Sequence, residues 1–389
     1  MYRIGQEEID AVANAIEQRS LFKINKSLQE TMHAEEEMRQ LFEVKNAILM
    51  TSGHAALVSA LIAMGIGPGD QVILPAYTYI ATAMAVVAAG AIPVIAEVDE
   101  TLTLCPIDTE KKITKHTKAI IPVHIQGFPC KMDALKALAD RYGLQLLEDA
   151  CQADGGRFHG KRLGTIGNAG ALSFNYFKVI TAGEGGALLT DDRKIFERAL
   201  IYHDSSAVAF FGDQLQDVEA HLFCGNEYRT NEISAAILRV QMRRMDGILA
   251  DLRRNKKYLM NALAKDCRFL PSNDIEGDCG TTLAISFDSA EKAAAFAERC
   301  TLKCTVPINT GKHVYTNWTP IMQKVGALHP LMDPFKMEAN KDIIPDYNAA
   351  LCPRTLELLA KTVYISVDPD QDVAALDETA VEIKKALSE

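Results

Sequence analysis

Ser173-Phe174-Asn175-Tyr176-Phe177-Lys178 lies just ahead of a glycine-rich run, Gly183-Glu184-Gly185-Gly186, in this chain of 389 residues. Upstream, another apolar segment ends in Glu148-Asp149. In an open α/β sheet, ligands bind at the carboxyl ends of the strands. A lysine that follows one buried strand and a carboxylate that ends another would both lie at that edge. We therefore predict that Lys178 and Asp149 share one edge of a sheet.

The alternation of short apolar runs with amphipathic segments between residues 30 and 190 predicts a mostly parallel sheet covered by helices on both faces. The expected strands are residues 47–50, 72–74, 93–98, 119–123 and 144–147. The expected helices are residues 53–64, residues 80–89 and a helix that Asp133 caps and Gly143 ends.

After Thr190 the pattern changes to helices at 191–202 and 231–263, followed by a polar link at 271–280. A smaller α+β unit is expected beyond the link, with strands at 282–287 and 362–367 and helices at 290–299 and 373–387. The chain is therefore predicted to be α/β, with a large domain over residues 1–250 and a small C-terminal domain over residues 251–389.

Composition excludes several classes of protein. The net charge is −10 and no Lys/Arg-rich stripe occurs, which argues against a nucleic-acid partner. No apolar run has the length of a membrane span, and the N-terminus lacks the apolar block of a signal peptide. The 9 cysteines form no C-x-x-C pair, so we expect reduced thiols, no metal site and a cytoplasmic location.

The chemistry of Lys178 and Asp149 suits one cofactor. A lysine amine forms an imine with an aldehyde, and a carboxylate keeps a pyridine nitrogen protonated so that the ring withdraws electrons. These are the two charges that the ring of pyridoxal 5'-phosphate needs. Either residue alone is ambiguous, because lone lysines are mostly on the surface and Asp149 by itself also suits a cap of the next turn.

The turn Thr51-Ser52-Gly53-His54 joins an expected strand to an expected helix and suits a phosphate group. Small residues there expose backbone N–H groups, and a helix N-terminus attracts an anion. Ser173 would add a hydroxyl. Tyr79 begins another helix at the same edge, where it would either stack on the ring or pack in the core.

Six motifs together resemble the DegT/DnrJ/StrS family of sugar aminotransferases, which share the aspartate-aminotransferase fold. The resemblance covers nearly the whole large domain. The motifs are S-G-H-A-A-L at 52–57, P-A-Y-T-Y-I-A-T at 75–82, I-P-V-H-I-Q-G at 121–127, E-D-A-C-Q-A at 148–153, S-F-N-Y-F-K at 173–178 and G-E-G-G at 183–186.

The resemblance implies roles for the residues around the cofactor ring. Lys178 would form the imine with the cofactor and then move the proton. Asp149 would pair with the ring nitrogen, Gln152 would lie by the ring hydroxyl, and Tyr79 would stack on the ring.

For the phosphate, the resemblance implies contacts from Gly53, Ser173 and His54, which stands where the family usually has Thr. It also implies a homodimer with shared active sites, in which one subunit sends an N-x-R loop into its neighbour. The matching stretch is residues 225–229; Glu227 replaces the usual asparagine, so Asn226 or Arg229 would make that contact.

The resemblance further implies a ping-pong transamination with L-glutamate as the amino donor and an oxo-sugar as the acceptor. Two other activities remain open, because relatives that carry histidine in place of the lysine are dehydratases and a cofactor-binding regulator would need no turnover. The lysine at 178 favours transamination.

The acceptor is expected to meet the segment from Lys312 to Trp318, whose Lys312, His313, Tyr315 and Trp318 offer charges and rings. Ordinary packing of that segment is an equal alternative. Lys23 and Lys26 would meet an anionic substrate or stay on the surface.

The H-V-Y-T-N-W-T-P-I run that begins at His313 is similar to a branch that forms 8-amino-3,8-dideoxy-octulosonate. That branch implies an 8-oxo-3-deoxy-octulosonate acceptor and a role in lipopolysaccharide biosynthesis. A nucleotide-linked keto-sugar is the alternative acceptor.

Overall fold

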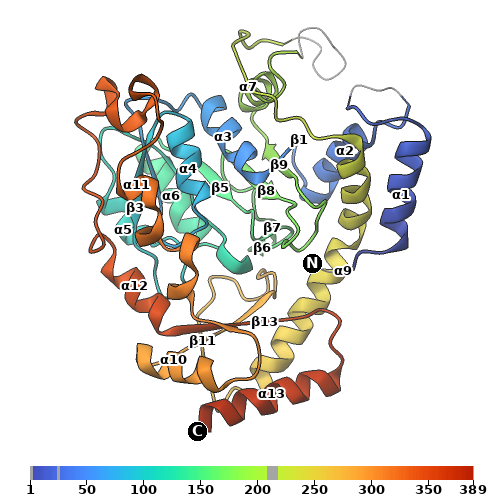
Figure 1. Cartoon of the computed structure of the whole chain (residues 1–389), viewed down its shortest axis with the longest axis vertical. Coiled ribbons are helices and arrows are strands. Elements are labelled where there is room, and N and C mark those ends of the chain that lie inside the picture. The colour runs from blue at the N-terminus through green and yellow to red at the C-terminus, as the bar shows by residue number, and fades with distance from the viewer. Residues whose placement is uncertain (1–2, 24–26, 208–217, 389) are drawn as a thin grey trace.

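Within residues 3–23, 27–207 and 218–388, which the computed structural model describes, seven strands form the central sheet (Figure 1). They are β1 (Asn46–Met50), β2 (Gln71–Pro75), β3 (Ile92–Ala96), β4 (Thr117–Ile120), β5 (Gln145–Asp149), β8 (Ala169–Ser173) and β9 (Gly186–Thr190). Their order across the sheet is β1-β9-β8-β5-β4-β2-β3. The expected mostly parallel sheet is confirmed, since only the pairs that include β9 are antiparallel.

The register of the sheet brings two of the predicted site residues to one edge. β5 runs parallel to β8, with Asp149 opposite Ala171, so both strands end on the same side. β9 returns antiparallel, and Gly186 lies opposite Ser173. The carboxyl ends of β5 and β8 therefore present Asp149 and Ser173 to the same space, as expected for an open α/β sheet.

Helices cover both faces of the sheet. One face is covered by α3 (Gly53–Ala63), α4 (Ala81–Ala88) and α7 (Arg193–His203), and the other by α2 (Glu30–Phe42), α6 (Met132–Tyr142) and α9 (Glu232–Ala262). Successive strand residues alternate between the two cores: Ile48 packs with the first set of helices and Leu49 with the second. This alternation explains why the strands read as unbroken apolar runs.

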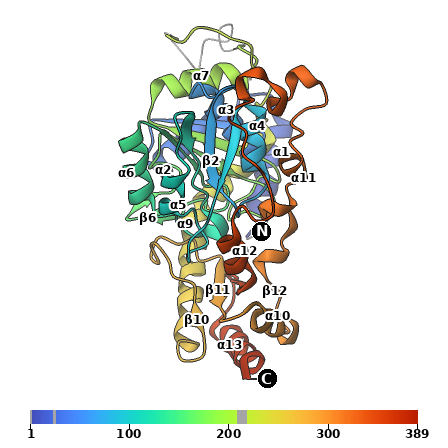
Figure 2. The same cartoon turned by 90° about the vertical axis from the view of Figure 1, so that its left-hand side faces the viewer.

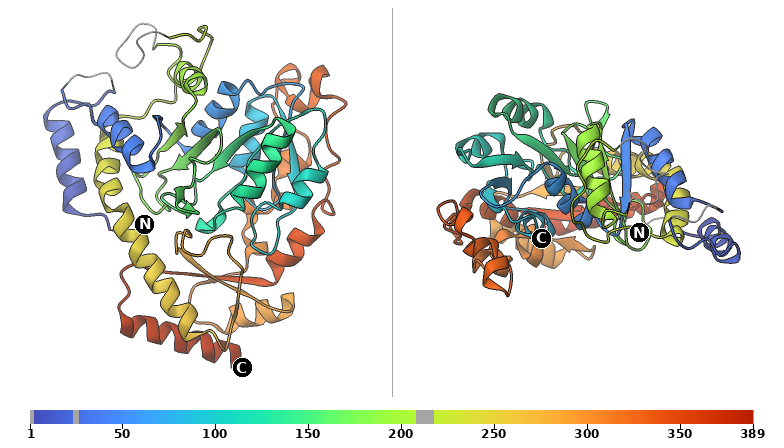
Figure 3. Two further views of the ribbon diagram at one scale, coloured as in Figure 1. Left: turned by 180° about the vertical axis from the view of Figure 1, so that it is seen from behind. Right: turned by 90° about the horizontal axis from the view of Figure 1, so that it is seen from above.

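The small domain lies beneath the large one (Figure 2). Its antiparallel sheet has the order β10-β11-β13-β12, formed by β10 (Arg268–Phe269), β11 (Thr282–Ser286), β13 (Thr362–Ser366) and β12 (Cys304–Thr305). The helices α10 (Ala290–Arg299) and α13 (Val373–Ser388) cover this sheet. The 31 residues of α9 run from the large domain into the small one, as the view from behind shows (Figure 3).

The predicted domain boundary at 250/251 falls inside α9. Side chains of this helix belong to one apolar cluster that includes residues of both domains. The chain also returns to the large domain after the small-domain strands begin. Side chains between Tyr315 and Cys352 pack in the core formed by α3 and α4, so this part of the C-terminal region belongs with the large domain.

The remaining described elements are short or lie at the periphery. They are α1 (Gln6–Glu17), α5 (Pro106–Lys111), β6 (Arg157–Phe158), β7 (Lys161–Arg162), α11 (Thr319–Met322), α12 (Pro353–Ala360) and the 3₁₀ helices η1 (Ile125–Gly127), η2 (Pro307–Asn309), η3 (Gly311–His313), η4 (Tyr315–Asn317), η5 (Pro330–Met332), η6 (Pro334–Lys336) and η7 (Glu338–Asn340). No helix in the described ranges combines the length and apolarity that crossing a membrane would require.

One predicted cap is wrong. The helix α6 begins at Met132, so Asp133 lies inside the first turn, and its carboxylate accepts the N–H of Ala134 at 2.8 Å. A negative charge is still favourable there, because the N-terminal turn carries the positive end of the helix dipole. The other end is as expected: Gly143 adopts a left-handed conformation (φ 65°) that closes the helix.

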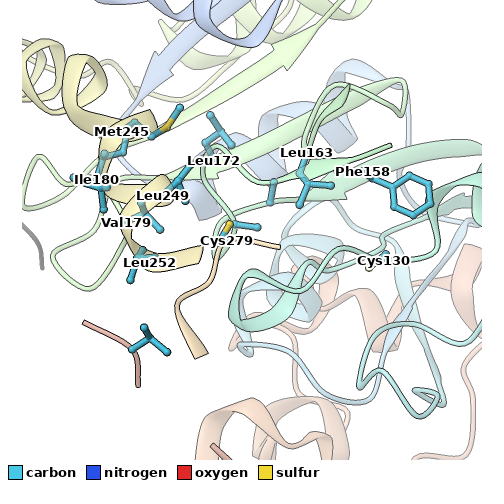
Figure 4. Close-up of a cluster of buried hydrophobic side chains, with 14 of the residues drawn as sticks. Cys130, Phe158, Leu163, Leu172, Val179, Ile180, Met245, Leu249, Leu252 and Cys279 are labelled. Carbon is cyan, nitrogen blue, oxygen red and sulfur yellow. The ribbon is translucent and has the colours of Figure 1, made fainter. Parts of the chain in front are cut away.

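The segment that follows Lys178 is anchored in the core. Val179 and Ile180 are buried against Met245, Leu249 and Leu252 of α9 (Figure 4). Burying two β-branched side chains contributes about 1.5–3 kcal/mol for each residue. Packing on α9 therefore holds the loop that carries the lysine.

Candidate active site

A pocket of about 710 Å³ opens where β5 and β8 end and is closed on the far side by residues of the small domain and of η3. Nine of the residues predicted from the sequence line it: Gly53, His54, Tyr79, Asp149, Gln152, Ser173, Lys178, Lys312 and His313. Thr281, Thr282 and Ser366 contribute the small-domain wall. The fold thus gathers residues that are far apart in the sequence into one site.

Asp149 is the last residue of β5, and its side chain is only 5% exposed. The Thr82 hydroxyl donates to one carboxylate oxygen at 2.7 Å, and the Cys151 N–H donates to the other at 3.2 Å. A buried carboxylate needs such donors and still has capacity for a further one. A protonated ring nitrogen in the pocket would supply it.

Glu148 holds the end of β5 in place from behind. Its fully buried carboxylate accepts the backbone N–H groups of Gly164, Ile166 and Gly167 at 2.5–2.9 Å. His124 completes this cluster, because its Nε2 lies 3.1 Å from Glu148, while its Nδ1 accepts the N–H of Cys130 at 3.0 Å. Since Nδ1 accepts the Cys130 N–H, the ring donates to Glu148 through Nε2–H.

The turn that begins α3 is a cradle that requires close backbone approach. A Cβ on Gly53 would lie 2.6 Å from Cys151 Sγ, and one on Gly186 would lie 2.2 Å from the carbonyl carbon of Ser52. The Ser52 hydroxyl caps the helix by accepting the Ala55 N–H at 3.1 Å. The first N–H groups of a helix have no intrahelical partner, so this turn offers donors to an anion.

His54 is the second residue of α3 and stays neutral. Its Nδ1 donates to the carbonyl of Ala81 at 3.2 Å, which leaves Nε2 as an acceptor. Burial lowers the pKa of His54, although its bond to Ala81 and the charge of Asp149 oppose this effect. An anion at this turn would therefore be held by backbone N–H groups rather than by a charged imidazole.

Lys178 sits on a loop with a fixed backbone. Its N–H donates to the carbonyl of Asn175 at 3.0 Å, and the Asn175 side chain donates to Glu184 at 3.0 Å. Lys178 forms no ion pair with any residue in the described parts of the chain. Its amine is therefore free to react with a ligand in the pocket.

Gln152 has a defined orientation. Its Oε1 accepts the N–H of Gln126 at 3.1 Å, so its NH₂ group remains as a donor. Gln126 also lines the pocket and has a left-handed backbone (φ 54°), and Thr281 of the small domain donates to its carbonyl at 2.8 Å. The strained Gln126 thus joins the two domains at the site.

The opposite wall is formed by Tyr79, Lys312 and His313. The Lys312 ammonium lies 4.9 Å from the centre of the Tyr79 ring, and the His313 ring lies 5.5 Å from it. Backbone bonds from Thr78 and Ile80 to the carbonyls of His313 and Lys312 hold the segment in place, each at 3.0 Å. This arrangement places a cation beside an exposed aromatic face.

Two residues predicted to meet the acceptor lie elsewhere. Trp318 and Tyr315 are fully buried in the core of the large domain. The Trp318 indole donates to the carbonyl of Lys312 at 3.0 Å, and the Tyr315 hydroxyl donates to that of Ala349 at 2.6 Å. The expectation that their rings stack on a sugar is therefore wrong; they hold the pocket wall in place from behind.

Lys23 is also misplaced for a substrate contact. It is only 3% exposed, does not line the pocket, and pairs with Glu35 at 2.8 Å. The expectation of an anionic substrate there is wrong, because the charge is already neutralised inside the protein. Lys26 lies outside the described residues.

Asn226 and Arg229 do not line the pocket of their own subunit. The Asn226 amide donates to the Tyr202 hydroxyl at 2.6 Å, and Arg229 pairs with Glu227 at 2.6 Å and covers the ring of Phe22. A cofactor contact from either residue would have to be made in a neighbouring subunit, and it stays a prediction.

Sequence reasoning missed Thr82, Gln126 and Asp154. Thr82 and Gln126 lie inside two of the quoted motifs, which were the only available signal for them. Asp154 follows a third motif by one residue and is completely buried.

Residues 3–298 match the family model described as the DegT/DnrJ/EryC1/StrS aminotransferase family. A dTDP-3-amino-3,4,6-trideoxy-alpha-D-glucose transaminase of Streptomyces venezuelae is 41% identical over 215 residues, which are 55% of each chain. An L-glutamine:2-deoxy-scyllo-inosose aminotransferase of Streptomyces kanamyceticus is 37% identical over 246 residues, 61% of this chain and 57% of that protein.

The matched region thus spans little more than half the length of these two curated relatives. The likeness in structure is more extensive. The X-ray structure of an aminotransferase from Psychrobacter cryohalolentis has a TM-score of 0.81 and 27% identity, and the alignment covers 99% of this chain and 98% of that one. The expected aspartate-aminotransferase-like fold is therefore confirmed.

Proposed function

The chain belongs to the DegT/DnrJ/EryC1/StrS aminotransferase family, and we propose that it transfers an amino group from an amino acid to an oxo-sugar with the help of pyridoxal 5'-phosphate. One observation carries this proposal. The same pocket is lined by Lys178, which has no ion-pair partner in the described chain, by the buried Asp149 and by the N-terminus of α3, where glycines allow close backbone packing. These are the groups that a pyridine aldehyde with a phosphate requires.

The residues present fit the cofactor. When bound, pyridoxal phosphate supplies an aldehyde that links to an amine and a ring that withdraws electrons from the reacting carbon. Asp149, oriented by Thr82 and Cys151, would hold the ring nitrogen, and the NH₂ of Gln152 would donate to the ring hydroxyl. The turn at Gly53 and His54, with Ser173, would bind the phosphate.

Lys178 would move the proton. Its Nζ would take a proton from the carbon that bears the amino group of the donor and return it on the other side of the transfer. The backbone bond to Asn175 and the packing of Val179 and Ile180 on α9 keep this nitrogen beside the pocket. One group that both gives and takes the proton favours transamination over the dehydratase and regulator alternatives.

The proposed donor is L-glutamate. L-glutamine is a second candidate, because the printed name of the S. kanamyceticus relative gives it as the amino donor of that enzyme. The two donors differ by one charge, and direct comparison of their rates with this protein would identify the substrate.

The proposed acceptor is an anionic oxo-sugar. Lys312 lies in the pocket beside Tyr79 and forms no ion pair with another described residue, so it would bind an acidic group. This suits an 8-oxo-3-deoxy-octulosonate, with a role in lipopolysaccharide biosynthesis. It also suits a nucleotide-linked keto-sugar, which the name of the S. venezuelae relative favours.

A homodimer with shared sites is part of the proposal. Phe177 lines the pocket and is 81% exposed, and its neighbour Tyr176 is 50% exposed. Exposed aromatic side chains beside a binding site commonly mark an interface. A neighbouring subunit that covers them would bring Asn226 or Arg229 to the phosphate. The 9 cysteines are all free, which fits the proposed cytoplasmic location.

The activity test uses purified protein loaded with the cofactor. Adding L-glutamate should bleach the absorbance of the lysine-linked cofactor and release 2-oxoglutarate, and subsequent addition of a suitable oxo-sugar should restore the absorbance. Lys178→Ala should show neither change and should lose borohydride labelling. Release of ammonia or a deoxy-sugar, with no 2-oxoglutarate, would support the dehydratase alternative and overturn the proposal.

The acceptor and the oligomer need separate measurements. An 8-oxo-3-deoxy-octulosonate and a panel of dTDP-linked keto-sugars, each assayed by amino-sugar formation, distinguish the two acceptor classes. Light scattering should report a dimer at assay concentration, and an Arg229→Ala variant should bind the cofactor more weakly. Full activity from a monomer would contradict shared sites.

A further inference from the structure

Gln126 is held in an unusual backbone conformation at the wall of the pocket. Its φ of 54° lies in the left-handed region, which is unfavourable for a residue that carries a side chain. Such a conformation persists only where the surrounding structure fixes it, and residues of this kind concentrate at binding sites. The contacts of Gln126 therefore indicate which of its groups is presented to a ligand.

Three hydrogen bonds fix Gln126, and each uses a different polar group of the residue. Its N–H donates to Gln152 Oε1 at 3.1 Å, and its carbonyl accepts the hydroxyl of Thr281 at 2.8 Å. Its side-chain Oε1 accepts the hydroxyl of Thr282 at 3.2 Å. The side-chain NH₂ is left without a hydrogen-bond partner among the described residues, so it has two N–H donors to offer to the pocket.

Ser366 offers a second uncharged group on the same wall. It is the last residue of β13 and lies directly opposite Thr282 of β11 in the small-domain sheet. Residues paired in this way have their side chains on the same face, about 5 Å apart, so Ser366 lies beside the contact between Thr282 and Gln126. Its side chain is exposed in the pocket, and its hydroxyl bonds to no other group within the described ranges.

The two free groups differ in kind from the charged part of the pocket. The amide of Gln126 donates, and the hydroxyl of Ser366 both donates and accepts, but neither carries a charge. An acidic group would be held more strongly by Lys312 or by the backbone at Gly53, because hydrogen bonds that involve a full charge are the stronger ones. The hydroxyl group of a sugar matches the pair, since it donates and accepts without charge.

We propose that Gln126 and Ser366 determine specificity by binding a hydroxyl group of the oxo-sugar acceptor. The inference rests on the proposed function, and it adds a contact to the neutral part of the acceptor, whose acidic group is assigned to Lys312. The NH₂ of Gln126 donates to the sugar oxygen, and the Ser366 hydroxyl accepts the sugar O–H. Because three hydrogen bonds orient Gln126 before the sugar arrives, little side-chain freedom is lost on binding. An acceptor without that hydroxyl leaves the amide unpaired.

The test measures the two half-reactions of the cofactor-loaded protein separately. The acceptor is whichever of 8-oxo-3-deoxy-octulosonate and the dTDP-linked keto-sugars the wild-type protein aminates. Gln126→Met keeps the length of the side chain and both backbone bonds but removes the amide. We expect Gln126→Met and Ser366→Ala each to raise the KM for the acceptor about 3–10-fold, the loss of one uncharged hydrogen bond, and to leave the donor half-reaction unchanged.

Ser286→Ala is the matched control for Ser366→Ala. Ser286 ends β11, the strand that pairs with β13, and lies outside this pocket. Its substitution should leave both half-reactions unchanged. Gln126→Gly is the second variant if Gln126→Met does not fold, because glycine adopts a φ of 54° without strain. A purely structural role for Gln126 predicts that glycine leaves the KM for the acceptor unchanged, whereas the inference predicts the same rise as with methionine.

Analogues of the acceptor that each lack one hydroxyl give an independent readout. One of them should raise the wild-type KM about 3–10-fold and have little further effect in Gln126→Met, where the bond is already absent. An unchanged acceptor KM in folded Gln126→Met and Ser366→Ala would overturn the inference, and so would equal slowing of the donor half-reaction. A wild-type protein that releases no 2-oxoglutarate, or aminates none of these sugars, would instead contradict the proposed function.

Discussion

The two sides of the pocket are built in different ways. The cofactor side comprises residues 52–54, 149–152, 173 and 178, which lie at or just after strand ends, at the start of α3 and, for Lys178, on the loop that follows β8. The side proposed to meet the acceptor, called here the acceptor side, is lined by Lys312 and His313, which belong to the irregular segment 311–318 and lie against Tyr79. Regular hydrogen bonding holds the first set, whereas a few backbone bonds and the buried Trp318 hold the second.

This difference shows how a fold separates chemistry from specificity. Strand ends are fixed by the sheet register, so the groups that handle the cofactor have little freedom. Irregular segments can change sequence without disturbing the sheet, so they are suited to choosing a substrate. Substitutions on the cofactor side should therefore affect every substrate, and those on the acceptor side should affect only one half of the reaction.

Among the substitutions that test this comparison, Asp149→Asn is expected to have the largest effect on turnover. Asp149→Asn should leave cofactor binding largely intact and slow turnover by about 10²–10⁴-fold, because the ring nitrogen would no longer stay protonated. Both half-reactions should slow together in stopped-flow absorbance. A near-normal rate in either half-reaction would contradict the assignment of Asp149 to the cofactor side.

The next effect is expected at Gly186, where an added Cβ would lie 2.2 Å from the backbone of Ser52. Gly186→Ala should lower the free energy of unfolding by about 1–3 kcal/mol and weaken cofactor binding, because the cradle must move. Denaturant unfolding and cofactor titration measure the two effects.

Gly247→Ala is the matched control for this substitution. It lies in α9, where its added Cβ would meet no heavy atom within 4 Å among the described residues beyond the neighbouring helix backbone, and the alanine should stabilise the protein by about 0.5–1 kcal/mol. Equal behaviour of the two alanine variants would show that the close contact is unimportant.

On the acceptor side, Lys312→Met should raise the KM for the acceptor about 10-fold and leave the donor half-reaction unchanged. The reason is the loss of one charge that would bind an acidic group, an effect of roughly 1–2 kcal/mol. Lys324→Met is the control, because Lys324 lies over Tyr347 outside the pocket. An equal loss in both half-reactions would place Lys312 on the cofactor side instead.

The smallest expected effect is on the pH dependence of stability, through His54 on the cofactor side and His313 on the acceptor side. Burial lowers the pKa of His54 and of His313 below the ordinary value of 6.5. The unfolded chain therefore binds protons at a pH where the folded chain does not, and the free energy of unfolding falls as the pH drops below about 6.5. Because both rings are partly exposed, each should contribute at most about 1 kcal/mol.

Denaturant unfolding of the cofactor-free protein between pH 7 and pH 5 measures this pH dependence. His54→Asn and His313→Asn should each flatten the curve, whereas a change at the exposed His221 should not. A steeper curve in either variant would contradict the assigned direction of the pKa shift.

Much of the cofactor side was predictable from the sequence. Asp149 and Lys178 follow apolar runs, and Gly53 sits in a strand-to-helix turn, so local pattern and the sheet rule suffice to bring them together. Thr82 was not predicted as a partner of Asp149. Its hydroxyl meets the carboxylate across 67 positions of sequence, and local periodicity carries no information on such a contact.

The acceptor side was predicted less well. Lys312 and His313 line the pocket as expected, but Trp318 and Tyr315 are buried behind it. Polar and aromatic residue types did not distinguish the positions that line the pocket from those that are buried behind it. In an irregular segment, the direction of each side chain follows from packing on neighbouring elements rather than from a repeat.

Short-range periodicity and turn chemistry were enough to predict the alternation of strands and helices, the turn at Gly53, a carboxylate at the end of one strand and an amine on the loop after another. The antiparallel return of β9, the path of residues 315–352 back onto the large domain and the complete burial of Asp154 could be learned only from the folded structure. Those features depend on contacts between segments that are distant in the sequence, and such contacts form only when the layers pack together.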